Sequence, residues 1–203
     1  MRIVDVCAFY APQGGGVKTY VERKLKAGAK AGHEIIILAP GERSAIVPTD
    51  GDGRIVLLPA RRFPLDRRYH YFDDEASLHT MLDRLQPDLV EASSPWSSAA
   101  MVGRWQGEAP RALIMHADPL SAYAYRWFGP VARRATIDRG FDWYWRHLRR
   151  LDAAFDLIVS ANDSLSARLR DGGIGGARTI AMGVEPGIFS PTLRNEVLRT
   201  HLL

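Results

Sequence analysis

Short, almost continuous apolar runs alternate along the chain with longer segments in which apolar residues recur every three or four positions. The runs predict buried strands, and the recurring pattern predicts amphipathic helices. Strands are expected at residues 2–10, 34–39, 54–58, 88–93, 111–116, 156–160 and 178–182. Because strands that are apolar throughout are covered on both faces, the predicted class is α/β: a doubly wound, mostly parallel Rossmann-like sheet of about seven strands with helices on both faces.

The helices are expected in the segments between these strands. In the first of them, apolar residues recur at helical spacing until Gly32 ends the pattern. Further helices are predicted at residues 78–85, after Trp96, through a long region that ends at Leu151, and at 163–170. Residues 60–71 mix arginine with aromatic residues without a clear period, so a surface loop is expected there.

Three consecutive glycines, Gly14, Gly15 and Gly16, separate the first predicted strand from the first predicted helix. Residues without Cβ allow positive φ angles and let another molecule approach the backbone N–H groups, and the positive end of the helix dipole lies at the same place. The pattern therefore predicts a phosphate-binding turn. The alternative is a turn that only allows the strand and the helix to pack closely.

Of two familiar phosphate loops, one does not fit these glycines and the other fits them only weakly. A Walker loop needs a lysine directly after the glycine, but Val17 separates Gly16 from Lys18, which moves the lysine about 100° around the helix. A dinucleotide fingerprint needs a glycine where Thr19 stands, and it needs an acidic residue after the second strand, where the sequence has residues 39–41, Ala-Pro-Gly. Neither motif assigns a ligand to the turn.

A doubly wound sheet binds ligands above the carboxyl ends of its strands, where the strand order reverses. We expect the first strand at the centre and the reversal between it and the fourth strand. The glycine turn, residues 93–96 and residues 116–118 would then meet at one crevice. Each of these groups also has a structural alternative. For His116 it is a hydrogen bond to the backbone, and for Asp118 it is formation of the turn before Pro119. For Ser93 and Ser94 it is capping of the next helix.

Composition places the chain among ordinary globular proteins, since 46% of its 203 residues are apolar and 25% are charged. The single Cys7 excludes an intrachain disulfide and fits a reducing compartment. No apolar run approaches the roughly 20 residues that cross a bilayer, and only Met1 precedes the first strand, so a cytoplasmic or peripheral protein is expected. The net charge of +4 comes from arginine, which suits phosphates and anionic surfaces without deciding between them.

Several segments follow one another at a characteristic spacing: Gly14-Gly15-Gly16-Val17, Gly32-His33-Glu34-Ile35, 87–92, His116-Ala117-Asp118, 156–161 and a last segment, 182–191. Together they resemble the amino-terminal half of a GT-B glycosyltransferase of the retaining family four, also called group 1. The last segment resembles the crossing from the first domain of this family to the second, with Met182 and Glu185 where the family usually has asparagine and aspartate. The resemblance implies a Rossmann-like acceptor-side domain at 1–182, with the linker and the start of a donor-binding domain at 183–203.

The resemblance further implies transfer of a sugar from a nucleotide sugar to a glycan or a lipid-linked acceptor. This chain would carry the acceptor side and would be inactive alone, because the second domain supplies most donor contacts. No metal and no cofactor besides the donor are expected. By the same resemblance, Gly14, Gly15 and Gly16 would face the donor diphosphate or an acceptor phosphate. His116 would face the transferred sugar, and Asp118 would face the sugar or the acceptor. The acceptor would also contact Ser94 and Trp96.

The alternative to an enzyme is a non-catalytic Rossmann-like module that binds a phosphorylated ligand. A nucleic-acid partner is not expected, because the basic residues are scattered and no recognition motif is present.

A separate feature is the segment 139–150. At about 100° per residue, one face carries four apolar residues expected in the core, and the opposite face carries Trp143 among arginines. A tryptophan flanked by arginines is typical of a helix that lies on anionic lipid headgroups. The alternative is a solvated arginine face with Trp143 covered by a loop or another domain. The apolar face consists of Phe141, Tyr144, Trp145 and Leu148. The opposite face consists of Arg139, Trp143, Arg146 and Arg150.

Overall fold

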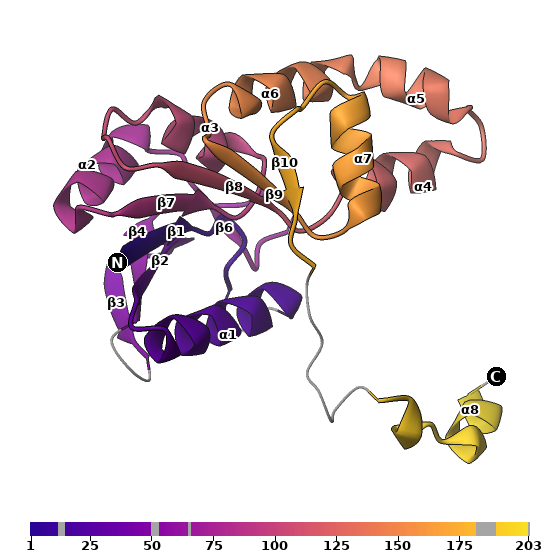
Figure 1. Ribbon diagram of the computed structural model, residues 1–203, viewed down its shortest axis with the longest axis horizontal. Helices are drawn as coiled ribbons and strands as arrows, with labels where there is room; N and C mark the ends of the chain where they lie inside the picture. The colour runs from indigo at the N-terminus through magenta and orange to yellow at the C-terminus, as the bar shows by residue number, and fades with distance from the viewer. Residues whose placement is uncertain (12–14, 50–52, 65, 182–189, 203) are drawn as a thin grey trace.

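The computed structural model describes residues 1–11, 15–49, 53–64, 66–181 and 190–202, and its core is one eight-stranded sheet (Figure 1). The strands are β1 (Arg2–Val6), β2 (Glu34–Gly41), β3 (Ala45–Pro48), β4 (Arg54–Pro59), β7 (Leu89–Ala92), β8 (Arg111–Met115), β9 (Leu157–Ser160) and β10 (Ala177–Thr179). Their order is β10-β9-β8-β7-β1-β2-β4-β3, and every pair is parallel except β3 with β4. The predicted fold class is confirmed.

Strand β1 occupies the centre of the sheet, as predicted. It pairs with β2 on one side and with β7 on the other, and Val4 and Val6 are completely buried. The chain builds the sheet outward from β1 in one direction through β2 and β4, and then returns to add β7, β8, β9 and β10 on the other side. The strand order therefore reverses between β1 and β7, at the place where the sequence predicts a crevice.

Two strand features were not predicted. Strand β3 is mostly exposed and pairs only at the edge of the sheet, so it lacks the continuous apolar run of a buried strand. Residues 60–71, predicted to be a loop, contain a two-stranded antiparallel ladder of β5 (Arg61–Arg62) and β6 (His70–Tyr71). The loop prediction was wrong there, because strands this short, with arginine in place of apolar residues, carry no readable period.

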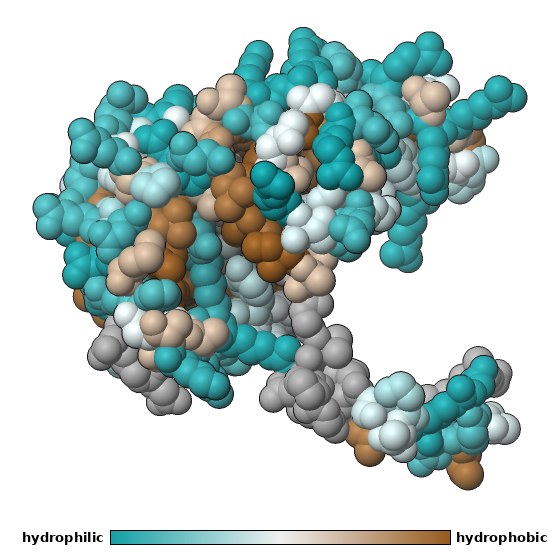
Figure 2. Space-filling view, viewed as in Figure 1, coloured by the Kyte–Doolittle hydropathy of each residue, from teal (hydrophilic) through white to brown (hydrophobic). Residues whose placement is uncertain are grey.

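Helix α1 (Gly16–Lys30) covers one face of the sheet, as Figure 1 shows. Val21 and Leu25 are buried against β2 and β4, as the helical spacing predicts. Gly28 lets the helix lie directly on β2, since a Cβ at this position would be 2.1 Å from Cγ1 of Ile35. In the same view, apolar side chains gather in the middle of the molecule and the outer helices are mostly hydrophilic (Figure 2).

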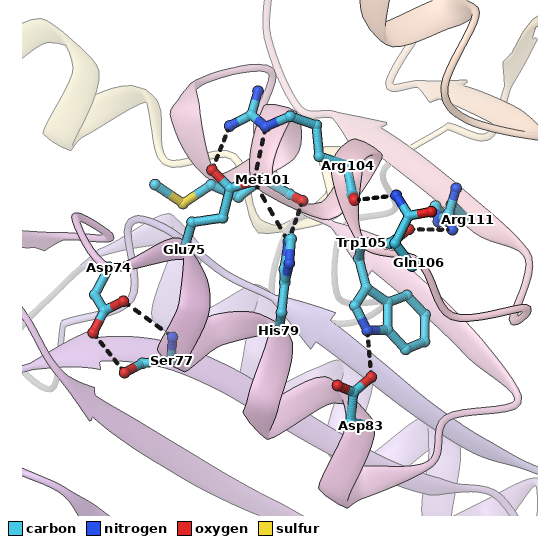
Figure 3. A network of polar contacts seen from close by, with 10 residues as sticks. All are labelled: Asp74, Glu75, Ser77, His79, Asp83, Met101, Arg104, Trp105, Gln106 and Arg111. Atoms are coloured by element: carbon cyan, nitrogen blue, oxygen red, sulfur yellow. Dashed lines mark hydrogen bonds and ion pairs between the residues drawn. The ribbon is translucent and has the colours of Figure 1, made fainter.

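The other face carries α2 (Glu75–Leu85), α3 (Ser97–Arg104), α6 (Asp142–Asp152) and α7 (Asp163–Asp171), and it holds the larger apolar core. Helix α3 is fixed against α2 by polar contacts (Figure 3). Arg104 donates to both carboxylate oxygens of Glu75 at 2.8 Å, and Nε2 of His79 lies 2.8 Å from the carbonyl oxygen of Met101. These contacts set the direction of α3, whose first turn opens beside the carboxyl end of β7.

The long helical region before residue 151 is helical but divided into several pieces. It begins with a π-helix, η1 (Leu120–Ala124), and continues with α4 (Tyr125–Phe128), α5 (Arg134–Gly140) and α6. Pro130 cannot donate a helical hydrogen bond, which explains the break after α4. Residues 139–150 therefore do not form one helix as predicted, because α5 ends at Gly140 and α6 begins at Asp142.

The described chain ends with a 3₁₀ turn, η2 (Pro191–Leu193), and α8 (Glu196–Leu202). The resemblance at 182–189, including Met182 and Glu185, lies outside the described residues. The domain boundary at 182/183 stays a prediction. In the part of the chain that the structure describes, no helix combines the length and the apolar character that a membrane span requires.

Candidate active-site crevice

A cleft of about 1160 Å³ lies at the carboxyl ends of β1, β7 and β8. Its walls come from the loops after these strands, the first turn of α1, the β5–β6 hairpin, and the region from η1 to α6. Most of the lining side chains are aromatic or aliphatic. Small-molecule sites have this character, with a few polar groups that fix the orientation of the ligand.

Three of the predicted site residues line this cleft together: Ser94, Trp96 and His116. Gly15 and Gly16 lie at the amino end of α1, and the neighbouring Val17 lines the cleft, so the glycine turn is at its rim. Gly14 lies outside the described residues.

Gly15 and Gly16 differ from the expected conformation in one respect. Gly15 has a φ of −82°, and Gly16 is the first residue of α1, so neither adopts a positive φ. A Cβ on either residue would meet nothing within 4 Å. No side chain caps α1 at Gly15, and the first N–H groups of a helix lack intrahelical partners. The described residues therefore leave room for a side chain at both glycines, and backbone conformation does not explain them.

His116 follows β8 and packs edge-on against Tyr20 of α1, with 4.5 Å between the ring centroids. Within the described ranges, its ring makes no hydrogen bond to backbone or side chain. Burial lowers the pKa of His116, although Asp5 opposes the shift. A neutral imidazole carries one N–H donor and one acceptor nitrogen, so His116 can hydrogen-bond a hydroxyl group of a ligand in either direction.

Asp118 is placed differently, because its carboxylate is already occupied. Oδ1 accepts from the backbone N–H of Leu120 at 2.9 Å, and Oδ2 accepts from Oγ of Ser121 at 2.6 Å. Nε of Arg168 lies 2.8 Å from Oδ2, and Asp118 does not line the cleft. This geometry matches the turn-forming alternative. A contact of Asp118 with a ligand stays a prediction.

Arg168 of α7 joins several elements around that turn. Its guanidinium lies 4.9 Å from the ring centroid of Tyr125 and 5.2 Å from that of Trp145, and it pairs with Asp138 at 2.9 Å. The contact between Arg168 and Asp118 thereby ties the loop after β8 to α4, α5 and α7. His116 is two residues away, so this network fixes the backbone that carries the histidine.

A buried charge cluster that the sequence analysis missed lies behind His116. Asp5 of β1 is completely buried, and its Oδ2 is 2.6 Å from Nζ of Lys24, which also pairs with Glu91 of β7. Ser93 donates from Oγ to Oδ1 of Asp5 at 2.6 Å. Polar residues inside two apolar strands, facing a lysine on the next helix, are the signal that would have found this cluster.

The cluster changes the acid–base properties of its members. Burial opposes the charged form of Lys24, but the two carboxylates outweigh burial and raise the pKa of Lys24 above its usual value. Burial raises the pKa of Glu91 against the opposing effect of Lys24. Burial also raises the pKa of Tyr20 to about 12, so this tyrosine is un-ionised beside His116. The cluster links α1 to the two central strands and so fixes Tyr20 against the histidine.

The family model for Glycosyltransferase Family 4 matches residues 14–187. A GDP-mannose-dependent alpha-(1-6)-phosphatidylinositol dimannoside mannosyltransferase of Mycobacterium tuberculosis is 29% identical over 99% of this chain and 51% of its own length. A GDP-mannose-dependent alpha-mannosyltransferase of the same species is 30% identical over 98% of this chain and 52% of its own length.

The chain thus spans about half the length of the curated relatives it matches. Among solved structures, a part of sucrose-phosphate synthase from Thermosynechococcus elongatus aligns with a TM-score of 0.55 and 13% identity, and the alignment covers 89% of this chain and 90% of that one. At this identity the likeness concerns the fold, which is the Rossmann-like half of a GT-B enzyme.

Proposed function

The chain belongs to glycosyltransferase family 4, and from this premise we propose that it is the acceptor-binding half of a nucleotide-sugar-dependent, retaining glycosyltransferase. The observation that carries the proposal is the cleft that brings His116, Ser94 and Trp96 together beside the exposed amino end of α1. The named relatives use GDP-mannose, so a GDP-hexose is the donor to test first.

The reaction would need the leaving diphosphate to be stabilised while the acceptor hydroxyl approaches the sugar. Gly15 and Gly16 are exposed at the uncapped amino end of α1, where backbone N–H groups and the positive end of the helix dipole are suited to a diphosphate oxygen. Neutral His116 would hydrogen-bond a hydroxyl of the transferred sugar and hold it in the cleft. Such preorganised donors act most strongly where charge develops in the transition state.

The proposal is tested by joining this chain to the second half of the M. tuberculosis alpha-mannosyltransferase and measuring transfer from GDP-mannose. We expect transfer by the chimera and none by the 203-residue chain alone, because most donor contacts belong to the second half. His116→Ala in the chimera should reduce turnover far more than it reduces the melting temperature. Turnover by the chain alone would contradict an active site between two halves. If the chimera transfers no sugar, phosphate binding by the chain tests the alternative of a binding module without catalysis.

We also propose peripheral contact with an anionic membrane. Two tryptophans that line the cleft are also exposed at the surface: Trp143 is 52% exposed and Trp127 is 66% exposed. Val131, which follows α4, is 83% exposed. Arg146 flanks Trp143 and pairs with Asp142 at 3.0 Å, in an exposed ion pair that is easily exchanged for a lipid phosphate. Tryptophan with neighbouring arginines suits the interface between headgroups and acyl chains.

Co-sedimentation with vesicles tests this contact. Binding should occur on anionic vesicles, fall with added salt, and be lost when Trp143→Ala is combined with Arg146→Ala. Ile46→Ala removes a similarly exposed apolar side chain from edge strand β3 and should leave binding unchanged. Absence of binding at low salt would refute membrane contact and leave a soluble acceptor.

A further inference from the structure

The cleft is bounded by two separate runs of aromatic rings. The first belongs to the β5–β6 hairpin and the loop after β1. Phe63 lies edge-on to Tyr71 with 6.4 Å between their centroids, and Phe9 lies edge-on to Tyr69 with 6.3 Å. All four side chains line the cleft. This side of the cleft is therefore a nearly apolar wall made by the hairpin that follows β4.

The second run follows α3 and α6 from the floor of the cleft to its rim. Successive centroids are 5.8 Å apart from Trp96 to Tyr144, 6.0 Å from Tyr144 to Trp143, and 6.2 Å from Trp143 to Phe141. Tyr144 is buried and Trp143 is exposed, so the run rises from the interior to the surface. Phe128, 6.3 Å from Phe141, extends it to α4. A ligand between the two walls would touch rings over the whole depth of the cleft.

Polar groups occur at only a few places in this cleft. Apart from the tyrosines and the buried thiol of Cys7, the ionisable side chains among the described lining residues are Asp66 and His116. The hydroxyls of Ser94, Ser98 and Tyr144 are buried and have no hydrogen-bond partner within the described chain. Small buried hydroxyls without partners gain hydrogen bonds when a polar ligand group arrives, since an unsatisfied group costs free energy. The cleft thus offers a few polar contacts on its floor and apolar contacts along its length.

We infer that the cleft holds the hydrocarbon chain of an amphiphilic acceptor, with the polar head at the His116 end and the alkyl or isoprenoid chain between the aromatic walls. The inference rests on the proposed glycosyltransferase function for the identity of the head, while the apolar site follows from the lining alone. Two features favour a hydrocarbon over a second protein surface: the site is concave, and it is continuous with the loop that carries His116. A chain held inside the protein would also fix the distance of the acceptor hydroxyl from the histidine.

The experiment titrates the 203-residue chain with alkyl β-glucosides of six to ten carbons, each below its critical micelle concentration, and follows tryptophan fluorescence and calorimetry. Transfer of one methylene group from water into an apolar site improves affinity about fourfold, so Kd should fall about fourfold with each added carbon. Binding should also show a negative heat-capacity change, which marks burial of apolar surface. Monomeric ligands separate a site inside the cleft from adsorption to a membrane.

Two variants locate the binding. Ala117 lines the cleft and is exposed, so Ala117→Trp fills the space without entering the core and should weaken decyl glucoside binding at least tenfold. Ala31→Trp places the same side chain at the exposed carboxyl end of α1 and should bind like the unmodified chain. Phe63→Ala removes one ring of the first wall and should also weaken decyl glucoside binding, which provides a second test if Ala117→Trp does not fold. Circular dichroism verifies the fold of each variant.

An affinity independent of chain length, or equal binding by Ala117→Trp and the unmodified chain, would overturn the inference. Self-association that excludes the glucosides would overturn it as well, because the cleft would then be an interface between copies. The two proposals fail separately. Transfer by the chimera with the same KM for alkylated and unalkylated acceptors would refute the chain site alone, whereas chain-length-dependent binding without transfer would refute the enzyme alone.

Discussion

Removal of Lys24 tests whether the buried charge cluster holds α1 in place behind His116. Lys24→Met keeps most of the side-chain length and removes the charge. It leaves Asp5, which is completely buried, and Glu91 without their shared cation. At 2.6 Å and an effective dielectric constant of about 20, the attraction between Lys24 and Asp5 alone is about 6 kcal/mol. Desolvation of the ions offsets part of it, and breaking a buried pair costs about 3–5 kcal/mol.

Urea unfolding at pH 7, followed by circular dichroism, measures this loss. With a denaturant slope of about 3 kcal/mol per molar, the midpoint should fall by roughly 1 to 2 M. Lys18→Met is the matched control on the same helix. Lys18 pairs with Glu22 at 3.7 Å, the two side chains are 41% and 55% exposed, and such a pair contributes less than about 0.5 kcal/mol.

The pH dependence provides an independent measurement. Burial raises the pKa of Glu91, and loss of the lysine removes the group that opposes this shift. The folded variant then binds a proton more readily than the unfolded chain, so its stability deficit should become smaller as the pH falls from 7 to 5. Glu91→Gln added to Lys24→Met should recover part of the loss for the same reason. If Lys24→Met costs no more than Lys18→Met, the cluster does not hold α1 and the reasoning is refuted.

Three further predictions concern substitutions at single residues. Because burial lowers the pKa of His116 in the folded state, unfolding free energy should fall as the pH drops below about 6.5, and His116→Gln should flatten that part of the urea-derived profile. Gly28→Val would clash with Ile35 and should cost about 1–3 kcal/mol in the same assay; an unchanged midpoint would show that α1 can move away from β2. Gly16→Val meets open space, so it should change stability by less than about 0.5 kcal/mol, yet weaken GDP-mannose protection of the chimera against proteolysis; unchanged protection would place the phosphate elsewhere.

Local sequence was sufficient for the central strands and for α1. Runs such as residues 34–39 are apolar because both faces of β2 are covered, and the spacing of Val21 and Leu25 follows from one buried helix face. The edge strand β3 and the β5–β6 hairpin escaped prediction for the opposite reason. Their residues are partly exposed and their pairing partners, rather than an apolar period, make them strands.

The candidate site was also predicted only in part. Parallel strands place their carboxyl ends at one edge, so the alternation of strands and helices was enough to bring His116, Ser94 and the glycine turn to one crevice. The sequence did not determine which of these groups is free to meet a ligand. Asp118 is occupied first by its local partners, the backbone N–H of Leu120 and Oγ of Ser121. Arg168, distant in sequence, adds a contact from α7, and this contact exists only once β8 and β9 are neighbours.

The amino-acid sequence is enough to predict the α/β class, the central position of β1 and the place of the crevice, because these depend on short apolar periods and on the geometry of parallel strands. The aromatic lining of the cleft and the pairing of Lys24 with two strands become visible only in the folded molecule. The cleft lining joins residues from the β5–β6 hairpin, η1 and α6. The pairing of Lys24 joins α1 to β1 and β7. Contacts between such distant segments are set by how the elements pack, and no local pattern records them.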